Sequence, residues 1–209
     1  MQKKEEILES FKTAIKSTIK SISNKNDIEI SFGGQDISSE DNKLRLPEIN
    51  DSQNKINFNL TRAQADSESL RLRYCNKKVL KNFEPAGLKA KRLYEIAEKI
   101  RYEYLGAQEY KGIKDNLISY YEKQKPPQNK TENIYFAFEN YLRGEFFKYS
   151  EKLKIEEIPS KFKKNFDKAF KTKINKIKEN FDKQKFFNST ISEIIKKLEI
   201  DETSDYEEM

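Results

Sequence analysis

Apolar residues recur at helical spacing from Thr61 almost to the end of this 209-residue chain, and no other pattern limits the fold class as strongly. The spacing predicts one helix over about 61–83. A second helix is expected to begin near Pro85 and to run to Leu105, with Gly106 as its stop, because proline suits a first helical turn and glycine follows many helix ends. The sequence therefore predicts a mainly α protein.

The C-terminal part continues the pattern after an interruption. Residues 123–131 contain two prolines and no apolar residue, which indicates a linker. Another helix is expected from Thr131, and a long one from Pro159–Ser160 to about Leu198. We therefore expect an N-terminal helical region (1–122), a linker (123–131), a C-terminal helical region (132–200) and an acidic tail or the start of a further linker (201–209).

A small β element is expected within residues 28–60, after a first amphipathic helix over 5–23. The stretch DIEISFGG alternates apolar and polar residues and stops at two glycines, which is typical of a strand and a turn. KLRLPEI and NKINFNL predict two further short strands, and Pro47 limits the first of these. The predicted fold is a helical domain with a small N-terminal β-hairpin element.

The residue inventory excludes several kinds of catalyst. The chain has no histidine, which removes Ser-His-Asp and Cys-His catalysis and the usual zinc or cobalt sites. Its six glycines never form the Gly-x-x-x-x-Gly-Lys-Ser/Thr pattern of a phosphate-binding loop. Cys75 is the one cysteine, and neither a membrane helix nor a signal peptide is apparent, so we expect a reduced, cytoplasmic protein. We expect a binding or assembly module with no catalytic or metal-binding residues of its own.

Arginine is unevenly placed. Only seven of the 41 basic residues are arginine, and three of these, Arg62, Arg71 and Arg73, fall within one expected helix. On a helical wheel Arg62, Asp66 and Arg73 form a line within an apolar face, whereas Arg71 points the opposite way, toward solvent. Arg101 falls inside the apolar sector of the next helix. Because an unpaired buried charge costs several kcal/mol, these residues are expected to form directional ion pairs, for which the planar arginine fork is suited.

Three interpretations of the arginines remain open. In the first, which we favour, Asp66 pairs with Arg101 or Arg73 in an internal network within one helical hairpin. In the second, the network faces a protein partner. In the third, it binds phosphate or nucleic acid, although nucleic acid is not the expected partner.

A second charged segment lies near the C-terminus. Ten lysines occur over residues 161–185, and apolar side chains recur among them at helical spacing. We favour a core-facing apolar stripe with lysines on the solvent side. The alternative is a basic helical RNA- or DNA-binding or protein-interaction module, which would also use the 16 basic and nine acidic residues of 61–130. The apolar stripe consists of Phe162, Phe166, Phe170, Ile174, Ile177 and Phe181.

Two stretches together resemble a known family. RAQADSESLRLRYCN, from Arg62, and EKIRYEYLGAQEYKGIKDNL, from Glu98, are similar to the N-terminal region of CobT, a subunit of the aerobic cobaltochelatase. SFGG and LRLPEI upstream also fit, so the resemblance covers residues 28–117. The family's paired histidines are Tyr74 and Cys75 here. The matching positions are Arg62, Asp66, Leu70, Arg71, Leu72, Arg73, Glu98, Arg101, Glu103, Leu105, Gly106, Ala107, Gly112, Asn116 and Leu117, with Asp182, Gln184 and Phe186 farther on.

The resemblance implies a role in cobalamin biosynthesis. It implies a subunit of the ATP-dependent ligase that inserts cobalt into hydrogenobyrinic acid a,c-diamide, inactive when isolated. The implied partners are an AAA+ ATPase subunit and a large tetrapyrrole-binding subunit. ATP, Mg²⁺ and Co²⁺ are expected on those partners, or on a von Willebrand factor A-type domain that follows an acidic linker in the family. The residues expected in a partner-binding or structural ion network are Arg62, Asp66, Arg71, Arg73, Glu98, Arg101, Glu103 and Asn116.

Overall fold

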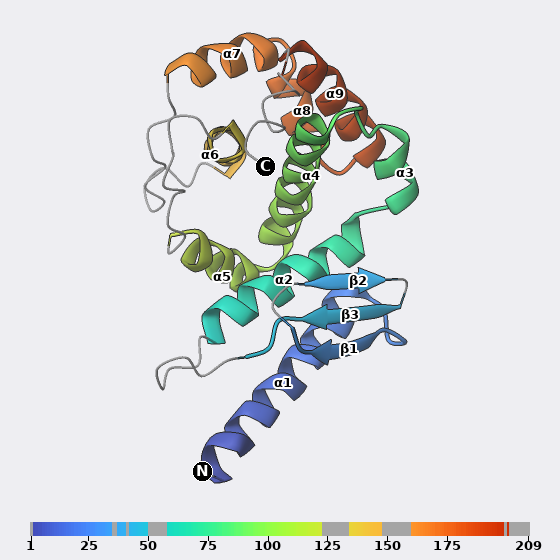
Figure 1. Cartoon of the computed structure of the whole chain (residues 1–209), viewed down its shortest axis with the longest axis vertical. Helices are drawn as coiled ribbons and strands as arrows, with labels where there is room; N and C mark the ends of the chain where they lie inside the picture. The colour runs from blue at the N-terminus through green and yellow to red at the C-terminus, as the bar shows by residue number, and fades with distance from the viewer. Residues whose placement is uncertain are drawn as a thin grey trace, which may run out of the picture. The chain divides into compact units, whose positions relative to one another are not determined.

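The chain forms two compact units in the computed structural model, and each is described separately. Unit 1 comprises residues 1–74 and 106–123, and unit 2 comprises residues 75–105 and 124–209. Helices predominate in both, and one small sheet lies near the N-terminus, which confirms the predicted fold class (Figure 1). The predicted linker and tail lie outside the described residues, which are 2–34, 37–40, 42–49, 58–122, 134–147, 160–198 and 200.

Unit 1 packs helices against a three-stranded sheet. Its elements are α1 (Gln2–Ser23), β1 (Glu29–Phe32), β2 (Ser38–Glu40), β3 (Lys43–Leu46), α2 (Phe58–Tyr74) and α5 (Lys111–Tyr121). The strand order is β1-β3-β2, with β1 parallel and β2 antiparallel to β3. Alternation along the strands turns Ile30, Leu44 and Leu46 toward Ile15 and Ile19 of α1, and these residues form the core of the unit.

The sheet differs from the prediction in two strands. NKINFNL was expected to form a strand, but α2 begins at Phe58, and the residues before Phe58 lie outside the described part of the chain. The hairpin is formed instead by β2 and β3. Residues 38–40 are Ser-Ser-Glu, which carry no apolar alternation, so sequence pattern alone did not reveal β2.

The helix predicted over 61–83 is interrupted after Tyr74. Asn76 has extended backbone angles, and its side-chain oxygen accepts hydrogen bonds from the backbone nitrogens of Lys78 (3.0 Å) and Val79 (3.2 Å). This is N-cap geometry, in which a short polar side chain satisfies the free N–H groups of a first turn. A separate helix, α3 (Lys77–Asn82), therefore begins here, and the prediction of one continuous helix was wrong.

Gly106 does not end a helix, contrary to the prediction. The helix α4 (Leu88–Glu109) continues through it. A Cβ atom at this position would lie 2.1 Å from Cδ2 of Leu70, a fully buried residue of α2. Glycine is required at position 106 because the α2 side chain packs directly on the α4 backbone.

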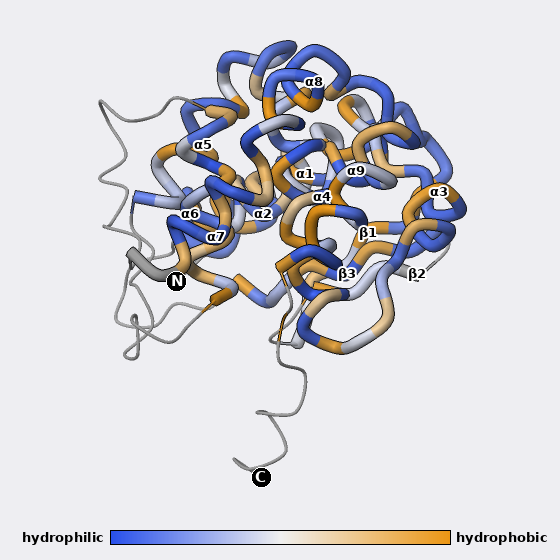
Figure 2. The backbone as a smooth tube through the Cα atoms, turned by 90° about the horizontal axis from the view of Figure 1, so that it is seen from above, coloured by the Kyte–Doolittle hydropathy of each residue, from blue (hydrophilic) through white to orange (hydrophobic). Residues whose placement is uncertain are grey.

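Every regular element in the described part of unit 2 is a helix. It contains α3, the part of α4 up to Leu105, α6 (Ile134–Phe147), α7 (Ser160–Phe170), α8 (Ile174–Glu179) and α9 (Gln184–Lys197). Its core joins Leu93 and Ile100 of α4, Phe138 of α6, Phe170 of α7 and Ile191 of α9. Hydrophobic and hydrophilic stretches alternate along the tube in Figure 2, as amphipathic helices require. None of the described helices has the length and apolar character needed to cross a membrane.

The long C-terminal helix was predicted wrongly, although its apolar stripe was placed correctly. Three helices replace it, and Asn180 marks one of the breaks by donating from its side chain to the Lys176 carbonyl at 2.8 Å. The turns allow successive parts of the stripe to pack on α6. Phe166 and Phe170 contact the ring of Phe138, with centroids 5.5 and 6.1 Å away, and Phe181 contacts Phe146.

Two helix glycines provide a matched test of this packing. We predict that Gly106→Ala lowers the free energy of unfolding by about 1–3 kcal/mol, because the new methyl group displaces the buried Leu70 side chain. Gly112→Ala, in α5, meets no atom within 4 Å and should be neutral or stabilising by up to about 1 kcal/mol. Urea denaturation measures both. Equal effects of the two substitutions would contradict the close approach.

Candidate functional site

The eight residues expected in one ion network are divided between the two units. Unit 1 contains Arg62, Asp66, Arg71, Arg73 and Asn116, and unit 2 contains Glu98, Arg101 and Glu103. Each group forms its own contacts. The eight residues therefore belong to separate clusters.

Asp66 is the buried carboxylate of unit 1. Its side chain is fully buried in α2, and its Oδ2 accepts a 2.7 Å hydrogen bond from Nδ2 of Asn116 in α5. Its Oδ1 lies 3.4 Å from Nε of Arg62, one turn earlier, in an ion pair that lacks hydrogen-bond geometry. These partners stand in place of the expected Arg101 or Arg73. Burial raises the pKa of Asp66, and the Asn116 hydrogen bond and the Arg62 charge offset this only in part.

Arg73 connects three helix ends in unit 1. Its Nη1 donates to the carbonyl of Ile22 at the end of α1, and its Nη2 pairs with Oε1 of Glu109 at the end of α4, each at 3.1 Å. The hydroxyl of Tyr74 donates to the other carboxylate oxygen of Glu109. Burial and this hydrogen bond raise the pKa of Tyr74 to about 12. The cluster holds α1, α2 and the end of α4 together.

Arg71 was predicted to point into solvent as an ordinary surface residue, and the structure differs from this prediction. Its Nε pairs with Oε2 of Glu68 at 2.7 Å, and the two side chains are only 23% and 12% exposed. The wheel was right that Arg71 lies away from Asp66, but a neighbouring carboxylate one turn earlier draws the guanidinium onto the helix surface.

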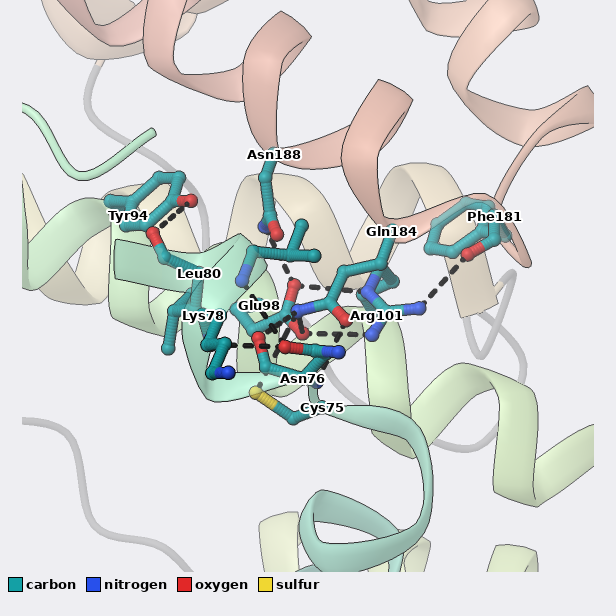
Figure 3. Close-up of polar contacts among 11 residues, drawn as sticks. Cys75, Asn76, Lys78, Leu80, Tyr94, Glu98, Arg101, Phe181, Gln184 and Asn188 are labelled. Atoms are coloured by element: carbon teal, nitrogen blue, oxygen red, sulfur yellow. Dashed lines mark hydrogen bonds and ion pairs between the residues drawn. The ribbon is translucent and has the colours of Figure 1, made fainter. Parts of the chain in front are cut away.

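Glu98 and Arg101 form the buried ion pair of unit 2 (Figure 3). Both residues lie in α4 and are at most 3% exposed in their side chains. The arginine fork donates to both carboxylate oxygens, with Nε 2.9 Å from Oε2 and Nη2 2.8 Å from Oε1. Two amides of α9 complete the shell: Gln184 donates to Oε1 at 3.1 Å and Asn188 to Oε2 at 2.8 Å. The carboxylate thus accepts four hydrogen bonds in a site without water access.

Arg101 also makes two contacts outside its own helix. Its Nη1 donates to the carbonyl of Phe181 at 3.2 Å, just before α9, and its guanidinium lies 5.9 Å from the centre of the Phe187 ring. A cation over an aromatic face gains about 0.5–2 kcal/mol when desolvated. The arginine therefore contacts both the start and the first turn of α9 as well as its own helix.

Gln184 extends the cluster to the segment before α3. Its Oε1 accepts from the backbone nitrogen of Asn76 at 2.8 Å, and its Nε2 donates to the Asn76 carbonyl at 3.2 Å. The sulfur of Cys75, a free thiol, lies 3.8 Å from the same Nε2 (Figure 3). One amide side chain therefore links the Glu98 carboxylate to the backbone at which α3 begins.

Glu103 forms a second buried ion pair in unit 2. Both terminal nitrogens of Arg143, in α6, donate to its Oε2 at 3.1 Å, and the Glu103 side chain has no exposed surface. Arg143 also pairs with Glu139 of its own helix at 2.8 Å. Burial acts to raise the pKa of Glu139, but the charges of Arg143 and Lys99 outweigh it, so the pKa is lowered.

Sequence reasoning missed the partners that come from other helices. Arg143 and Asn188 stand in unremarkable helical patterns, and the weak family correspondence at Asp182–Phe186 was the one signal that pointed to Gln184. Within the described residues, no three carboxylate, thiol or imidazole groups converge in a way that could hold a metal ion. The clusters fix helices relative to one another inside each unit, and in unit 2 the buried charges of Glu98 and Glu103 each lie beside an arginine.

Comparison with known proteins supports the sequence resemblance. A family model described as "Cobalamin biosynthesis protein CobT" matches residues 5–140 of the chain. This range includes all eight predicted network residues, whereas Arg143, Gln184 and Asn188, which complete the clusters of unit 2, lie beyond it. No solved structure matches the chain.

We predict that Glu98→Gln severely destabilises unit 2. Arg101 would then remain as a buried cation without a counter-charge, which costs roughly 3–5 kcal/mol and lowers the melting temperature by more than about 10 °C. Glu95→Gln is the matched control, because it removes an exposed carboxylate from the same helix and should change the stability by less than about 0.5 kcal/mol. A Glu98→Gln chain with the same melting temperature as the wild type would refute the role assigned to the pair.

Asp66 provides a prediction with a defined pH dependence. Because its folded pKa is raised, its proton stabilises the fold, and this stabilisation is lost as the pH rises from the unfolded pKa, about 4, through the folded value. Asp66→Asn should therefore gain stability relative to the wild type as the pH rises above about 4. Denaturation series at several pH values measure this difference, and Asp115→Asn, at an exposed position of α5, is the control. A variant that loses stability relative to the wild type as the pH rises would contradict the burial argument.

Proposed function

This chain belongs to the CobT family of cobalamin biosynthesis proteins, and we propose that it is an assembly subunit of the aerobic cobaltochelatase. In this proposal it joins an AAA+ ATPase subunit and a large tetrapyrrole-binding subunit in the cytoplasm, and the complex inserts cobalt into hydrogenobyrinic acid a,c-diamide. The observation that carries the proposal is the family match over residues 5–140.

The charges of the matched region support an assembly role. Glu98 pairs with Arg101 and accepts hydrogen bonds from amides of α9, and Glu103 pairs with Arg143. Such pairs position helices but leave no free acid, base or nucleophile for a reaction. The sequence also lacks a phosphate-binding loop and histidine, so ATP, Mg²⁺ and Co²⁺ would be bound by partners or by a further domain of the family.

The exposed fractions of the side chains limit which of the predicted network residues a partner could contact. The side chains of Asp66 and Glu103 are fully buried, whereas that of Arg62 is 37% exposed. Asp66 holds Arg62 through its Nε, which leaves the two terminal nitrogens without a partner among the described residues. We therefore assign partner contact to Arg62 and a structural role to the buried members of the predicted set.

We predict that Arg62→Ala weakens the complex with the ATPase subunit by at least about tenfold, equivalent to 1.4 kcal/mol. Its effect on the free energy of unfolding should stay near 1 kcal/mol, because Arg62 is partly solvated. Arg92→Ala, which removes an exposed arginine from unit 2, should leave binding unchanged. Calorimetric titration of the ATPase subunit with each variant measures the affinities.

The same preparation tests the proposed function as a whole. Cobalt insertion by the ATPase and large subunits should require the addition of this chain, and heat-denatured chain serves as the control. The isolated chain should neither hydrolyse ATP nor bind Co²⁺ with micromolar affinity. ATP hydrolysis by the isolated chain, or full cobalt insertion without it, would overturn the proposal.

A further inference from the structure

Unit 2 carries a cationic surface that its internal contacts leave unmatched. Residues 160–198 contain 12 lysines and four carboxylates. Lys173 pairs with Glu193 and Lys178 with Glu145. Nine further lysines are exposed and form no ion pair with the described part of the chain. Three of them are set aside, because Lys183 donates to Asn180 and the charges of Lys196 and Lys197 act on the Glu193 carboxylate. The other six, on α7, α8, the turn between them and the start of α9, define the lysine face: Lys163, Lys164, Lys168, Lys171, Lys176 and Lys185.

A hollow of about 560 Å³ opens on the lysine face beside α6 and α7. Its apolar lining consists of Tyr141, Phe170 and Ile174. Two lysines, Lys168 and Lys171, also line it. A hollow with apolar walls and two unpaired ammonium groups is suited to an aromatic side chain flanked by carboxylates.

Two carboxylates, Glu145 and Asp167, also line the hollow, but they do not neutralise the charges of Lys168 and Lys171. Glu145 is paired with Lys178, which stands outside the lysine face, at 3.1 Å. Asp167 lies beside the hydroxyl of Tyr141, and burial together with this carboxylate raises the pKa of Tyr141. The charge offered to a ligand is therefore positive.

A segment of this chain has the complementary chemistry. Residues 199–209 contain six carboxylates, no basic residue and one aromatic residue, Tyr206. Leu198 and Ile200 pack against the core of unit 2, so the segment starts on the unit that carries the lysine face. The nine residues after Ile200 can extend about 30 Å, and a tether of this length gives effective concentrations in the millimolar range.

We propose that residues 201–209 bind across the lysine face, with Tyr206 at the hollow, and thereby compete with external polyanions for this surface. Individual exposed ion pairs are weak and screened by salt, so the contact depends on the tether and is displaceable. This inference goes beyond the chelatase role and does not depend on it.

Zero-length carbodiimide coupling of the full chain tests the contact directly. Peptide mass spectrometry should show carboxylates of 201–209 joined to lysines of the lysine face at 50 mM salt, and the products should disappear near 1 M salt, where the Debye length is about 3 Å. The pair Lys168→Gln and Lys171→Gln should reduce coupling at the remaining four lysines at least about threefold. Lys77→Gln and Lys78→Gln remove the same charge from exposed positions of α3 and should not change it.

A competition measurement tests the consequence. A full chain with Glu202→Gln, Asp205→Asn, Glu207→Gln and Glu208→Gln should bind a fluorescein-labelled 20-nucleotide single-stranded DNA at least about fivefold more tightly at 50 mM salt. Adding Lys168→Gln and Lys171→Gln should abolish that gain. Unchanged DNA affinity, or coupling to lysines outside the lysine face, would overturn the inference. So would coupling between chains, which shows in a mixture of ¹⁵N-labelled and unlabelled protein as products that join a labelled to an unlabelled peptide.

Discussion

The buried pair of Glu98 and Arg101 imposes the strongest constraint on unit 2. Two charges without water access are tolerated only when every donor and acceptor is used, since an unmatched one costs several kcal/mol. One helix cannot meet this demand alone, because the carboxylate needs more donors than the guanidinium supplies. The amides of Gln184 and Asn188 complete the shell, so α9 must pack on α4 at one register. A packing error of one residue along α9 would leave the carboxylate short of donors.

The kind of interaction was predictable from the sequence, but its partners were not. A helical wheel places Arg101 among apolar residues, and solvation physics then requires a carboxylate beside it. The wheel cannot tell which carboxylate, because periodicity defines a face and not the neighbour that covers it. Asp66 was expected to pair with Arg101 or Arg73, whereas Asn116 and Arg62 are its partners. Arg143 could not have been foreseen as the partner of Glu103, since they lie on different helices 40 residues apart.

The helix boundaries failed for a related reason. Apolar spacing continues through residues 61–83, and the stripe continues through 162–181, although both segments contain breaks. Asn76 and Asn180 divide them through side-chain hydrogen bonds to nearby backbone groups, which compete locally with helix continuation. Gly106 shows the opposite error, because a residue that often ends helices here permits close helix packing. Apolar spacing predicted the fold class, and local hydrogen bonding and packing decided where these helices begin and end.

Arginine and lysine have different structural roles in this protein. Arg101 and Arg143 are buried and use several donors each, which a planar fork allows and a single ammonium group does not. Lysines such as Lys164 and Lys171 stay on the solvent side, where a flexible stem costs little and a charge needs no fixed partner. The few arginines thus determine the internal register of the helices. The many lysines determine which surfaces attract anionic groups, and the two kinds of positive charge can vary almost independently.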